Sequence, residues 1–511
     1  MKRALAAALG SLVLVAAGLQ ARGSTGDLKV AGYEYPHQAA GQSLTADLDA
    51  IFSDAAVSRG LISARIDSLR SGETIYSRNA DKLVMPASNM KILTMTVAAE
   101  KLGWNFTYET RLEAVGTITD GVLNGDLIVV GGGDPTILSN DAGPAPLMTE
   151  WAAALRKAGI KRVNGRILGD DSYFDDETLG MGWSWDDMVF GYSAPIGGLS
   201  YNENQVVARV SPGAKPGDPA AIELLPTSGH GLVVTNRVVT EARPAGAAPD
   251  ARLRAAVSFD RLFGQNTLVV AGTIPVGIAP AVQTVAVNNP TLFFVESLRL
   301  GLMADGVIVR DGAFDMDEIT APPATGARAL ITKRTSPPLS LIGPYFMKES
   351  QNYIAETLFK TLGRVVKGQG TAAAGRAAVT ETLTGWGVPA DAIVMRDGSG
   401  LSRYNYVTTS AIVTTLTRMW NDDALRGPFA AALPVAAHDG TLSNRMKNTW
   451  LDNHVQAKTG TISNVRSLSG YLETKSGERI VFSIIGNHFT VPSSQIDAIA
   501  EKALALVADR R

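Results

Sequence analysis

Two kinds of hydrophobic pattern alternate along this chain. Apolar residues recur at helical spacing over 88–100, 353–359 and 496–507, and the last of these is amphipathic enough to pack on a sheet. Apolar runs on both sides of Lys475-Ser476-Gly477 predict the two strands of a β-hairpin. Helices and strands in one chain favour a mixed α/β (α+β) fold class.

The middle of the chain changes character once. Over 106–203 helical and strand-like segments mix, as at 147–158. Over 204–282 short β runs, such as 231–235 and 267–270, are separated by Gly- and Pro-rich clusters. We therefore predict a mixed α/β module followed by a small, mostly β module.

The N-terminus has the pattern of an export signal. Met1-Lys2-Arg3 is followed by an apolar run over 4–19 and a polar stretch from Gln20. That run is short for a membrane span but typical of a signal peptide, so we predict one over 1–21, with an uncleaved anchor as the alternative. The mature protein is then expected in the periplasmic or cell-wall space.

Composition narrows the function classes. A chain of 511 residues is too long for one compact core. A net charge of −2 with 19% charged residues provides no basic field for nucleic acid. The absence of cysteine excludes disulfides, thiol catalysis, thiolate metal sites and a lipoprotein anchor.

Ser88 and Lys91 are the first candidates for chemistry. Pro86 fits a helix entry, and a spacing of three places Lys91 one turn above Ser88 on the same face. A lysine that burial keeps neutral can accept the serine proton, and the helix N-terminus favours the developing negative charge. The alternative is an ordinary helix start with a solvated lysine.

Two further motifs follow in order. Ser350-Gln351-Asn352 precedes a helical pattern, and Lys458-Thr459-Gly460-Thr461 leads into a strand-like segment. Ser200-Tyr201-Asn202 also fits the first of these motifs, but it lies in a Gly- and Pro-containing stretch with no helical pattern after it. The three ordered motifs are the signature of penicillin-recognising serine acyltransferases.

Longer blocks strengthen this interpretation. From about residue 40 to the end, the chain resembles the class C low-molecular-mass penicillin-binding proteins, the D-alanyl-D-alanine carboxypeptidase/endopeptidase family. The blocks that carry the resemblance are GGGDPT at 131–136, GWSWDD at 182–187, DGSGLSR at 397–403, LPVA at 433–436 and DGTL at 439–442. Gln351 is a departure, because the family often has aspartate there.

The resemblance implies an architecture. The interval between Ser88 and Ser350 is much longer than that between Ser350 and Lys458, as expected for a large insertion. We expect a transpeptidase domain like those of penicillin-binding proteins and serine β-lactamases, with two nested inserted domains, the inner one mostly β. The expected bounds are 25–105 and 283–511 for the catalytic domain, 106–203 for the outer insertion and 204–282 for the inner one.

The resemblance also implies roles around the nucleophile. Ser88 attacks the penultimate D-alanine of a peptidoglycan stem peptide to form an acyl-enzyme, with Lys91 as base. Ser350 relays a proton to the leaving amine, and Asn352 bonds the substrate backbone. Lys458 supplies positive charge and disfavours protonation of Lys91.

The third motif is expected to hold the substrate. Thr459 and Thr461 bind the terminal carboxylate or its counterpart in penicillin, and Gly460 allows close approach of the strand. The backbone N–H groups of Ser88 and Thr461 form the oxyanion hole. β-Lactam antibiotics are then covalent inhibitors, and the resemblance implies no cofactor.

Several residues have two interpretations. Asp170 and Arg403 resemble the family's pair that grips a diaminopimelate end, but an inter-domain salt bridge is the alternative. Asp397 fits a turn cap better than a catalytic role. Trp183 and Trp185 fit packing better than a sugar platform. Among the histidines only His438 is a candidate for the cleft, and the histidine spacing predicts no metal site.

Two other functions compete with peptidoglycan hydrolysis. A serine β-lactamase shares the acylation chemistry, but no Glu-x-x-x-Asn segment for deacylation occurs between Asn352 and Lys458. A non-catalytic wall-binding or β-lactam-sensing protein does not need three intact motifs. Carboxypeptidase and endopeptidase activity cut the same D-Ala-D-X bond, so the sequence leaves both open.

Overall fold

The structure is a computed structural model that describes residues 43–139, 145–244, 246, 253–262 and 265–511. The expected signal peptide, 1–21, lies outside these residues. Within the described part, we find no helix with the length and apolar character needed to cross a membrane.

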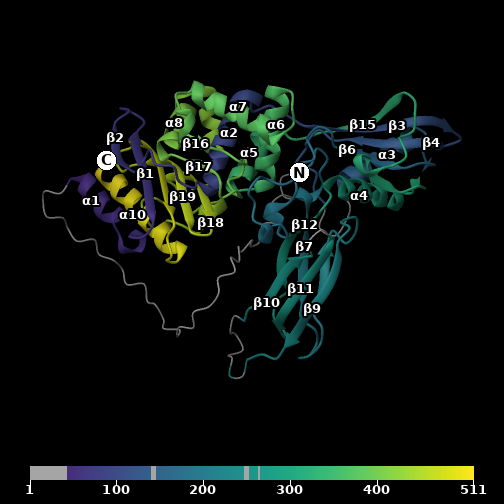
Figure 1. The fold of residues 1–511 in the computed structure, drawn as a ribbon, viewed down its shortest axis with the longest axis horizontal. Helices are drawn as coiled ribbons and strands as arrows, with labels where there is room; N and C mark the ends of the chain where they lie inside the picture. Colours follow the sequence, from purple (N-terminus) through teal and green to yellow (C-terminus); the bar gives the residue numbers. More distant parts are fainter. Residues whose placement is uncertain (1–42, 140–144, 245, 247–252, 263–264) are drawn as a thin grey trace. The chain divides into compact units, whose positions relative to one another are not determined.

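A five-stranded antiparallel sheet brings the two ends of the described chain together (Figure 1). Its order is β18 (Val455–Ile462), β19 (Val465–Glu473), β20 (Arg479–Asn487), β1 (Leu61–Ser68) and β2 (Thr74–Arg78). Alternate residues of β1 face opposite sides, because side chains alternate along a strand. Ile62 and Ala64 join a core with α1 (Leu44–Phe52) and α10 (Ser493–Arg510), whereas Ser63 Oγ lies 2.8 Å from Thr409 Oγ1 on α8 (Thr409–Asn421).

The other face of this sheet carries a helical core around α2 (Met90–Leu102). Ten consecutive residues of α2, from Met90 to Ala99, are buried. A helix that is buried on every side has to contact neighbours all around it. The remaining elements of this core are α5 (Leu339–Lys348), α6 (Asn352–Lys367), α7 (Ala372–Gly385) and α9 (Asp423–Ala432), with the short pair β16 (Ile393–Val394) and β17 (Tyr406–Val407) nearby.

A seven-stranded mixed sheet forms the outer insertion. Its strands are β3 (Glu109–Thr119), β4 (Val122–Val130), β5 (Arg162–Val163), β6 (Ile167–Asp170), β13 (Ile308–Val309), β14 (Ala313–Asp315) and β15 (Arg328–Thr335). The helices α3 (Pro146–Lys157) and α4 (Pro290–Ala304) pack with it.

Two three-stranded sheets form the small β module. One contains β8 (Ala221–Leu225), β7 (Gln205–Ser211) and β12 (Ala281–Ala286), and the other contains β10 (Ala256–Arg261), β11 (Thr267–Pro275) and β9 (Val233–Glu241). Their buried side chains, such as Val206 and Val270, belong to the same hydrophobic core as Leu112 and Leu127 of the seven-stranded sheet. The insertion therefore has separate sheets but one continuous core.

The pairing of strands moves one expected boundary. The sequence predicts the return to the catalytic part at 283, with helical spacing near Pro290. In the structure α4 packs on β6 and β14, and β15 pairs with β3, so residues 283–335 belong to the insertion. The pattern at 290–304 correctly predicts a helix but assigns it to the wrong module, because its apolar face does not reveal which sheet it covers.

Candidate active site

Ser88 and Lys91 lie where a short turn becomes a helix. The 3₁₀ turn η2 (Ala87–Asn89) leads into α2, so the helix proper begins two residues later than the apolar pattern suggests. Lys91 Nζ lies 3.0 Å from Ser88 Oγ, as the three-residue spacing predicts. Ala87 has φ of +46°, a left-handed conformation unusual for a residue with a side chain. Strain of this kind concentrates at functional sites.

Lys91 has three polar neighbours and no exposed surface. Its Nζ lies 2.6 Å from Asn352 Oδ1 and 2.8 Å from the carbonyl of Ser399. A neutral amine has two N–H groups for these two acceptors and one lone pair, which can accept the hydroxyl proton of Ser88. The geometry therefore suits a lysine that acts as a base.

Burial lowers the pKa of Lys91 to about 7. The negative charges of Asp397 and Glu356 act in the opposite direction and favour the protonated amine. Near neutral pH the lysine is thus divided between the two forms. This is the range in which a general base is most effective.

Asn352 connects the base to the insertion. Its Nδ2 donates to the carbonyl of Tyr192 at 2.8 Å, while its Oδ1 accepts from Lys91. Only one orientation of the amide satisfies both partners. The residue predicted to bind the substrate backbone is therefore also a link between α2 and the inserted module.

Ser350 and Lys458 form the second hydroxyl–amine pair. Lys458 Nζ lies 2.8 Å from Ser350 Oγ and 2.9 Å from the carbonyl of Thr459. Burial, and then the charge on Lys91, lowers the pKa of Lys458 well below its usual value. Two buried ammonium groups disfavour each other, so the site does not readily hold two positive charges. Ser350 also has a left-handed backbone, with φ of +61°.

Gly460 lies against the turn that carries the nucleophile. A Cβ at this position would be 2.1 Å from Ser467 Oγ, 2.7 Å from the carbonyl oxygen of Pro86 and 2.9 Å from the backbone N of Ser88. Two of these atoms are backbone, so they cannot move aside cheaply. Glycine is therefore required for β18 to approach Ser88, whose N–H is one of the two expected oxyanion donors.

The two threonines of the third motif have hydroxyl partners of different kinds. Thr459 Oγ1 lies 2.7 Å from Thr441 Oγ1, which places the DGTL block beside β18. Thr461 Oγ1 accepts a hydrogen bond from the Arg466 guanidinium across the β18–β19 register. Sequence reasoning missed Arg466, and the hairpin register was the signal that could have found it.

Glu356 is a second residue that sequence reasoning missed. It lies one turn after Asn352 on α6 and is 5% exposed. Its carboxylate accepts from the backbone N–H groups of Gly398 and Ser399, at 3.0 and 2.7 Å. A lone acidic residue within an apolar helical stretch was the available signal.

Asp397 organises the loop at 397–402, as the turn-cap interpretation expected. Its carboxylate accepts from the backbone N–H groups of Gly400 and Ser402 at 2.8 and 2.6 Å and from Asn405 Nδ2 at 2.6 Å. It also accepts from Trp183 Nε1 at 2.9 Å, a buried contact with the inserted module. Two blocks that are far apart in the sequence thus meet.

Asp170 and Arg403 have different partners in the structure. Asp170 ends β6, accepts from Ser172 Oγ at 2.6 Å and lies 3.7 Å from Arg328 Nη1. Arg403 donates to the backbone carbonyl of Ser463, just beyond β18, at 3.1 and 3.2 Å. Arg403 is thereby brought to the end of the KTGT strand, whereas Asp170 is paired within the insertion.

Three acidic residues form a cluster near Asp170. Two of them, Asp171 and Asp176, follow it in the chain, and the third, Asp317, comes from a distant part of the insertion. Their carboxylate oxygens lie within 4.8 Å of one another. Burial raises the pKa of Asp171 to about 6, against the hydrogen bond that it accepts from Thr291 Oγ1 at 2.5 Å.

The remaining candidates are outside the motif cluster. His438 is 54% exposed and its Nε2 lies 3.1 Å from Asp452 Oδ1, a surface pair. Trp183 is buried, as a packing role expects, whereas Trp185 is 77% exposed.

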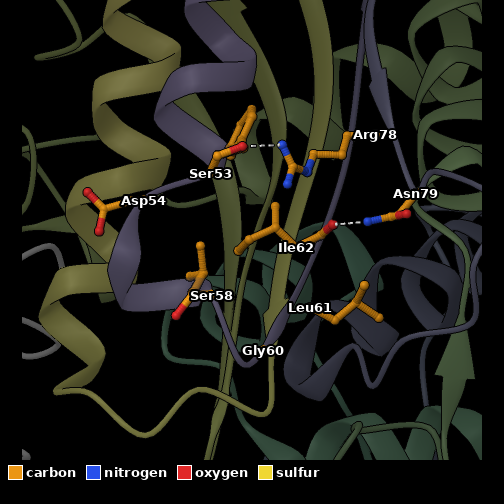
Figure 2. Close-up of a pocket in the computed structure, with 10 residues that line it drawn as sticks. Ser53, Asp54, Ser58, Gly60, Leu61, Ile62, Arg78 and Asn79 are labelled. Atoms are coloured by element: carbon orange, nitrogen blue, oxygen red, sulfur yellow. Dashed lines mark hydrogen bonds between the residues drawn. The ribbon is translucent and has the colours of Figure 1, made fainter.

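A cavity of about 230 Å³ lies at the α1 corner of the sheet (Figure 2). In it Arg78 donates to Ser53 Oγ at 3.0 Å and Asn79 donates to the carbonyl of Ile62 at 2.9 Å. None of the motif residues lines this cavity, so it is distinct from the Ser88 site.

Comparison with known proteins identifies the family of this chain. A family model described as the D-Ala-D-Ala carboxypeptidase 3 (S13) family matches residues 44–508. A D-alanyl-D-alanine carboxypeptidase of Actinomadura sp. (strain R39) is 34% identical over 470 residues, covering 89% of this chain and 84% of the relative. The D-alanyl-D-alanine carboxypeptidase DacB of Haemophilus influenzae is 27% identical over 422 residues, covering 81% and 83%.

Solved structures show the same fold. A crystal structure of penicillin binding protein 4 from Haemophilus influenzae matches with a TM-score of 0.76 and 24% identity, covering 89% of this chain and 98% of that one. The same protein in complex with a novel β-lactam matches with a TM-score of 0.70 and 23% identity, covering 89% and 97%. This chain belongs to the D-Ala-D-Ala carboxypeptidase 3 (S13) family, a family of serine peptidases, and has the fold of a low-molecular-mass penicillin-binding protein.

Proposed function

We propose that this enzyme is an exported serine D-alanyl-D-alanine carboxypeptidase and DD-endopeptidase that hydrolyses D-Ala-D-X bonds of peptidoglycan stem peptides. The observation that carries the proposal is the contact of Ser88 Oγ with Lys91 Nζ at 3.0 Å, in a site where burial brings the pKa of the lysine to about 7. A serine beside a base of that strength is an activated nucleophile.

Acylation follows from the arrangement of the two hydroxyl–amine pairs. Neutral Lys91 accepts the proton of Ser88 as Oγ attacks the D-alanine carbonyl. The oxyanion then lies between the N–H groups of Ser88 and Thr461, and the close approach of Gly460 to Ser88 N supports this placement. Ser350 delivers a proton to the leaving amine and takes a proton in turn from the ammonium form of Lys458, which it contacts. Water then hydrolyses the ester.

Recognition of the leaving residue rests on β18. Both a terminal D-alanine and a cross-linked D-centre carry a carboxylate next to the leaving amine, as does the penicillin nucleus. Thr459 and Thr461 are the proposed hydroxyl donors to it. The Arg466 guanidinium beside Thr461 adds positive charge, which favours a carboxylate ligand.

Penicillin acylation and export complete the proposal. The β-lactam complex of the Haemophilus influenzae protein supports β-lactam binding by this fold. The signal-like pattern over 1–21 supports a periplasmic or cell-wall location. The substrate is peptidoglycan, and the role is remodelling of the cell wall.

A fluorescent penicillin tests the nucleophile. The purified protein is expected to be labelled once, on the peptide that contains Ser88, and Ser88→Ala is expected to lose all labelling. Ser443→Ala, in a turn after the DGTL block, is the matched control and should label normally. Labelling that survives in Ser88→Ala, or that maps to another peptide, would exclude the proposed nucleophile.

Digestion of purified sacculi tests the two hydrolytic activities. Loss of pentapeptides reports the carboxypeptidase, and loss of cross-linked dimers reports the endopeptidase. Both are expected from the wild type and neither from Ser88→Ala. A protein that is labelled by penicillin but releases neither product would be a β-lactam-binding protein rather than a hydrolase.

A further inference from the structure

Glu356 is a buried carboxylate for which the acylation steps have no role. It lies on α6 one turn beyond Asn352, with 5% of its surface exposed. Burial of an acidic side chain is costly unless its oxygens are bonded. Here each oxygen accepts a backbone N–H from the loop at 397–402, at 3.0 Å from Gly398 and 2.7 Å from Ser399.

The same loop is held from its other side by α2. The carbonyl of Gly398 accepts from Thr94 Oγ1 at 2.7 Å, and the carbonyl of Ser399 accepts from Lys91 Nζ at 2.8 Å. Glu356 therefore accepts hydrogen bonds from the N–H groups of Gly398 and Ser399, and the carbonyl groups of the same two residues contact α2. A shift of this segment away from α6 or toward it would change the position of a direct partner of the base.

The fit of the loop leaves no space for such a shift without strain. A Cβ at Gly398 would lie 2.7 Å from Phe359 Cβ and 2.9 Å from the carbonyl oxygen of Ala355, both on α6. A Cβ at Gly400, whose φ is +85°, would lie 1.8 Å from the carbonyl oxygen of Ala87, next to the nucleophile. The loop at 397–402 therefore packs tightly between α6, which carries Asn352, and the turn η2, which carries Ser88.

We propose that Glu356 is a positioning residue for Lys91, which acts by holding the Ser399 carbonyl against the amine. The proposal rests on the function proposed above, because it takes Lys91 as the base. A carboxylate group can hold the Ser399 carbonyl in place in this way, because its two oxygens accept from two consecutive N–H groups at once. Glutamine has one acceptor oxygen, so it leaves one of the two N–H groups facing an NH₂ group.

The charges around the base give this role a measurable signature. Asp397 and Glu356 are the negative groups that favour protonated Lys91, and Lys458 is the positive group near it, itself influenced by Glu349. Burial, and then the charge of Asp397, raises the pKa of Glu356 to about 8, so the charge of Glu356 is not what the acidic limb reports. Displacement of the Ser399 carbonyl lowers the pKa of Lys91, because this acceptor stabilises the ammonium form.

The test is the pH profile of penicillin acylation in Glu356→Gln. We expect the maximal acylation rate to fall roughly tenfold or more, as for loss of a charge-assisted hydrogen bond. We also expect the acidic limb to move to lower pH, because Lys91 loses the carbonyl acceptor that stabilises its ammonium form. Glu381→Gln is the matched control. The Glu381 carboxylate is 65% exposed and pairs with Lys367, which is the last residue of α6, the helix that carries Glu356.

Each outcome decides the proposal. A lower rate with the shifted limb supports it. A lower rate with the wild-type limb means only general damage to the fold, and a wild-type profile means no role; both overturn it. If Glu356→Gln does not fold, Glu356→Asp keeps the charge but is too short to reach both N–H groups, and a wild-type rate in that variant overturns the proposal. Absence of Ser88 labelling in the wild type would instead exclude the proposed function.

Discussion

The catalytic part and the insertion differ in how their charged side chains are paired. In the catalytic part Lys91 and Lys458 are completely buried, and each amine is surrounded by hydrogen-bond acceptors. On the seven-stranded sheet the charged side chains form ion pairs instead. Some pairs are exposed, such as Lys333 with Glu109 at 2.7 Å, and others contain a buried carboxylate, such as Arg166 with Asp126 at 2.9 Å. Exposed pairs of this kind contribute about 0–1 kcal/mol each.

This difference indicates what each region contributes to catalysis. Burial is what lowers the pKa of the two lysines, so chemistry depends on the packed catalytic part. The insertion contributes two neutral groups to the site, the Tyr192 carbonyl on Asn352 and the Trp183 indole on Asp397. It also contributes the buried Glu203, whose carboxyl group accepts from Gln351 Nε2 at 3.1 Å. We therefore expect catalytic variants to lose chemistry and insertion variants to lose positioning or specificity.

Among the variants proposed to test this difference, Lys91→Arg should have the largest effect on the acylation rate. Arginine keeps the positive charge but does not give up its proton near neutral pH. Acylation by penicillin is expected to fall by about 10²–10⁴, the usual contribution of a general base. Stopped-flow or gel-based acylation rates measure this directly.

The wild-type pH profile sharpens the same prediction. Because the pKa of Lys91 is about 7, the neutral amine increases as pH rises through 7, and acylation should rise with it. Lys101→Arg, in the last turn of the same helix, is the control and should be normal. A near-normal acylation rate in Lys91→Arg would mean that the lysine acts only through its charge.

Gly460→Ala tests whether the close approach of β18 to Ser88 is needed. The added Cβ meets two backbone atoms at less than 3 Å, so the strand has to move and the Ser88 N–H loses its placement. The loss of one oxyanion donor costs about 10²–10³ in rate. The measurement is the acylation rate at saturating penicillin, with melting temperature to verify folding.

A glycine with free space around it provides the control. Gly385 ends α7, and a Cβ added there would meet no neighbouring atom within 4 Å, so Gly385→Ala is expected to leave acylation unchanged. Equal losses in the two variants would mean that the effect of Gly460→Ala is one of stability rather than oxyanion geometry.

The sequence predicts the catalytic part better than the insertion for a physical reason. Ser88 and Lys91 are within one turn of a helix, so their contact follows from local spacing. Which sheet α4 covers depends instead on pairing of β13 and β14 with β5 and β6, strands far away in the sequence. Glu356 was missed for the same reason, because its partners Gly398 and Ser399 are reached only through the tertiary fold. Arg466 is different, because its partner Thr461 lies opposite it in the same hairpin.

Asp170→Ala tests whether the insertion selects substrates. If Asp170 meets the amine of a diaminopimelate end, the variant should lose about 1–3 kcal/mol in kcat/KM for peptides with that end, and acylation by simple penicillins should be unchanged. Arg328, 3.7 Å away, offers the competing explanation that Asp170 only orders the sheet edge. Arg328→Gln is therefore measured beside it.

The pair of variants separates the two explanations. Substrate selection by Asp170 itself predicts that Arg328→Gln keeps most of the peptide activity. If both variants lose the same activity, the pair orders the sheet edge and Asp170 makes no contact with substrate. If Asp170→Ala loses peptide hydrolysis and penicillin acylation equally, the aspartate is structural for the whole enzyme.

Trp183→Phe is expected to have the smallest effect and tests the link between the two regions most directly. It removes the indole N–H that Asp397 accepts at 2.9 Å but keeps most of the buried ring. Asp397 retains its three other donors, so the loss should be about 1 kcal/mol, or roughly fivefold in acylation rate. Trp185→Phe changes the same residue type at a site that is 77% exposed, and its rate should equal that of the wild type. If Trp183→Phe also acylates at the wild-type rate, the hydrogen bond from Trp183 does not help to hold the 397–402 loop.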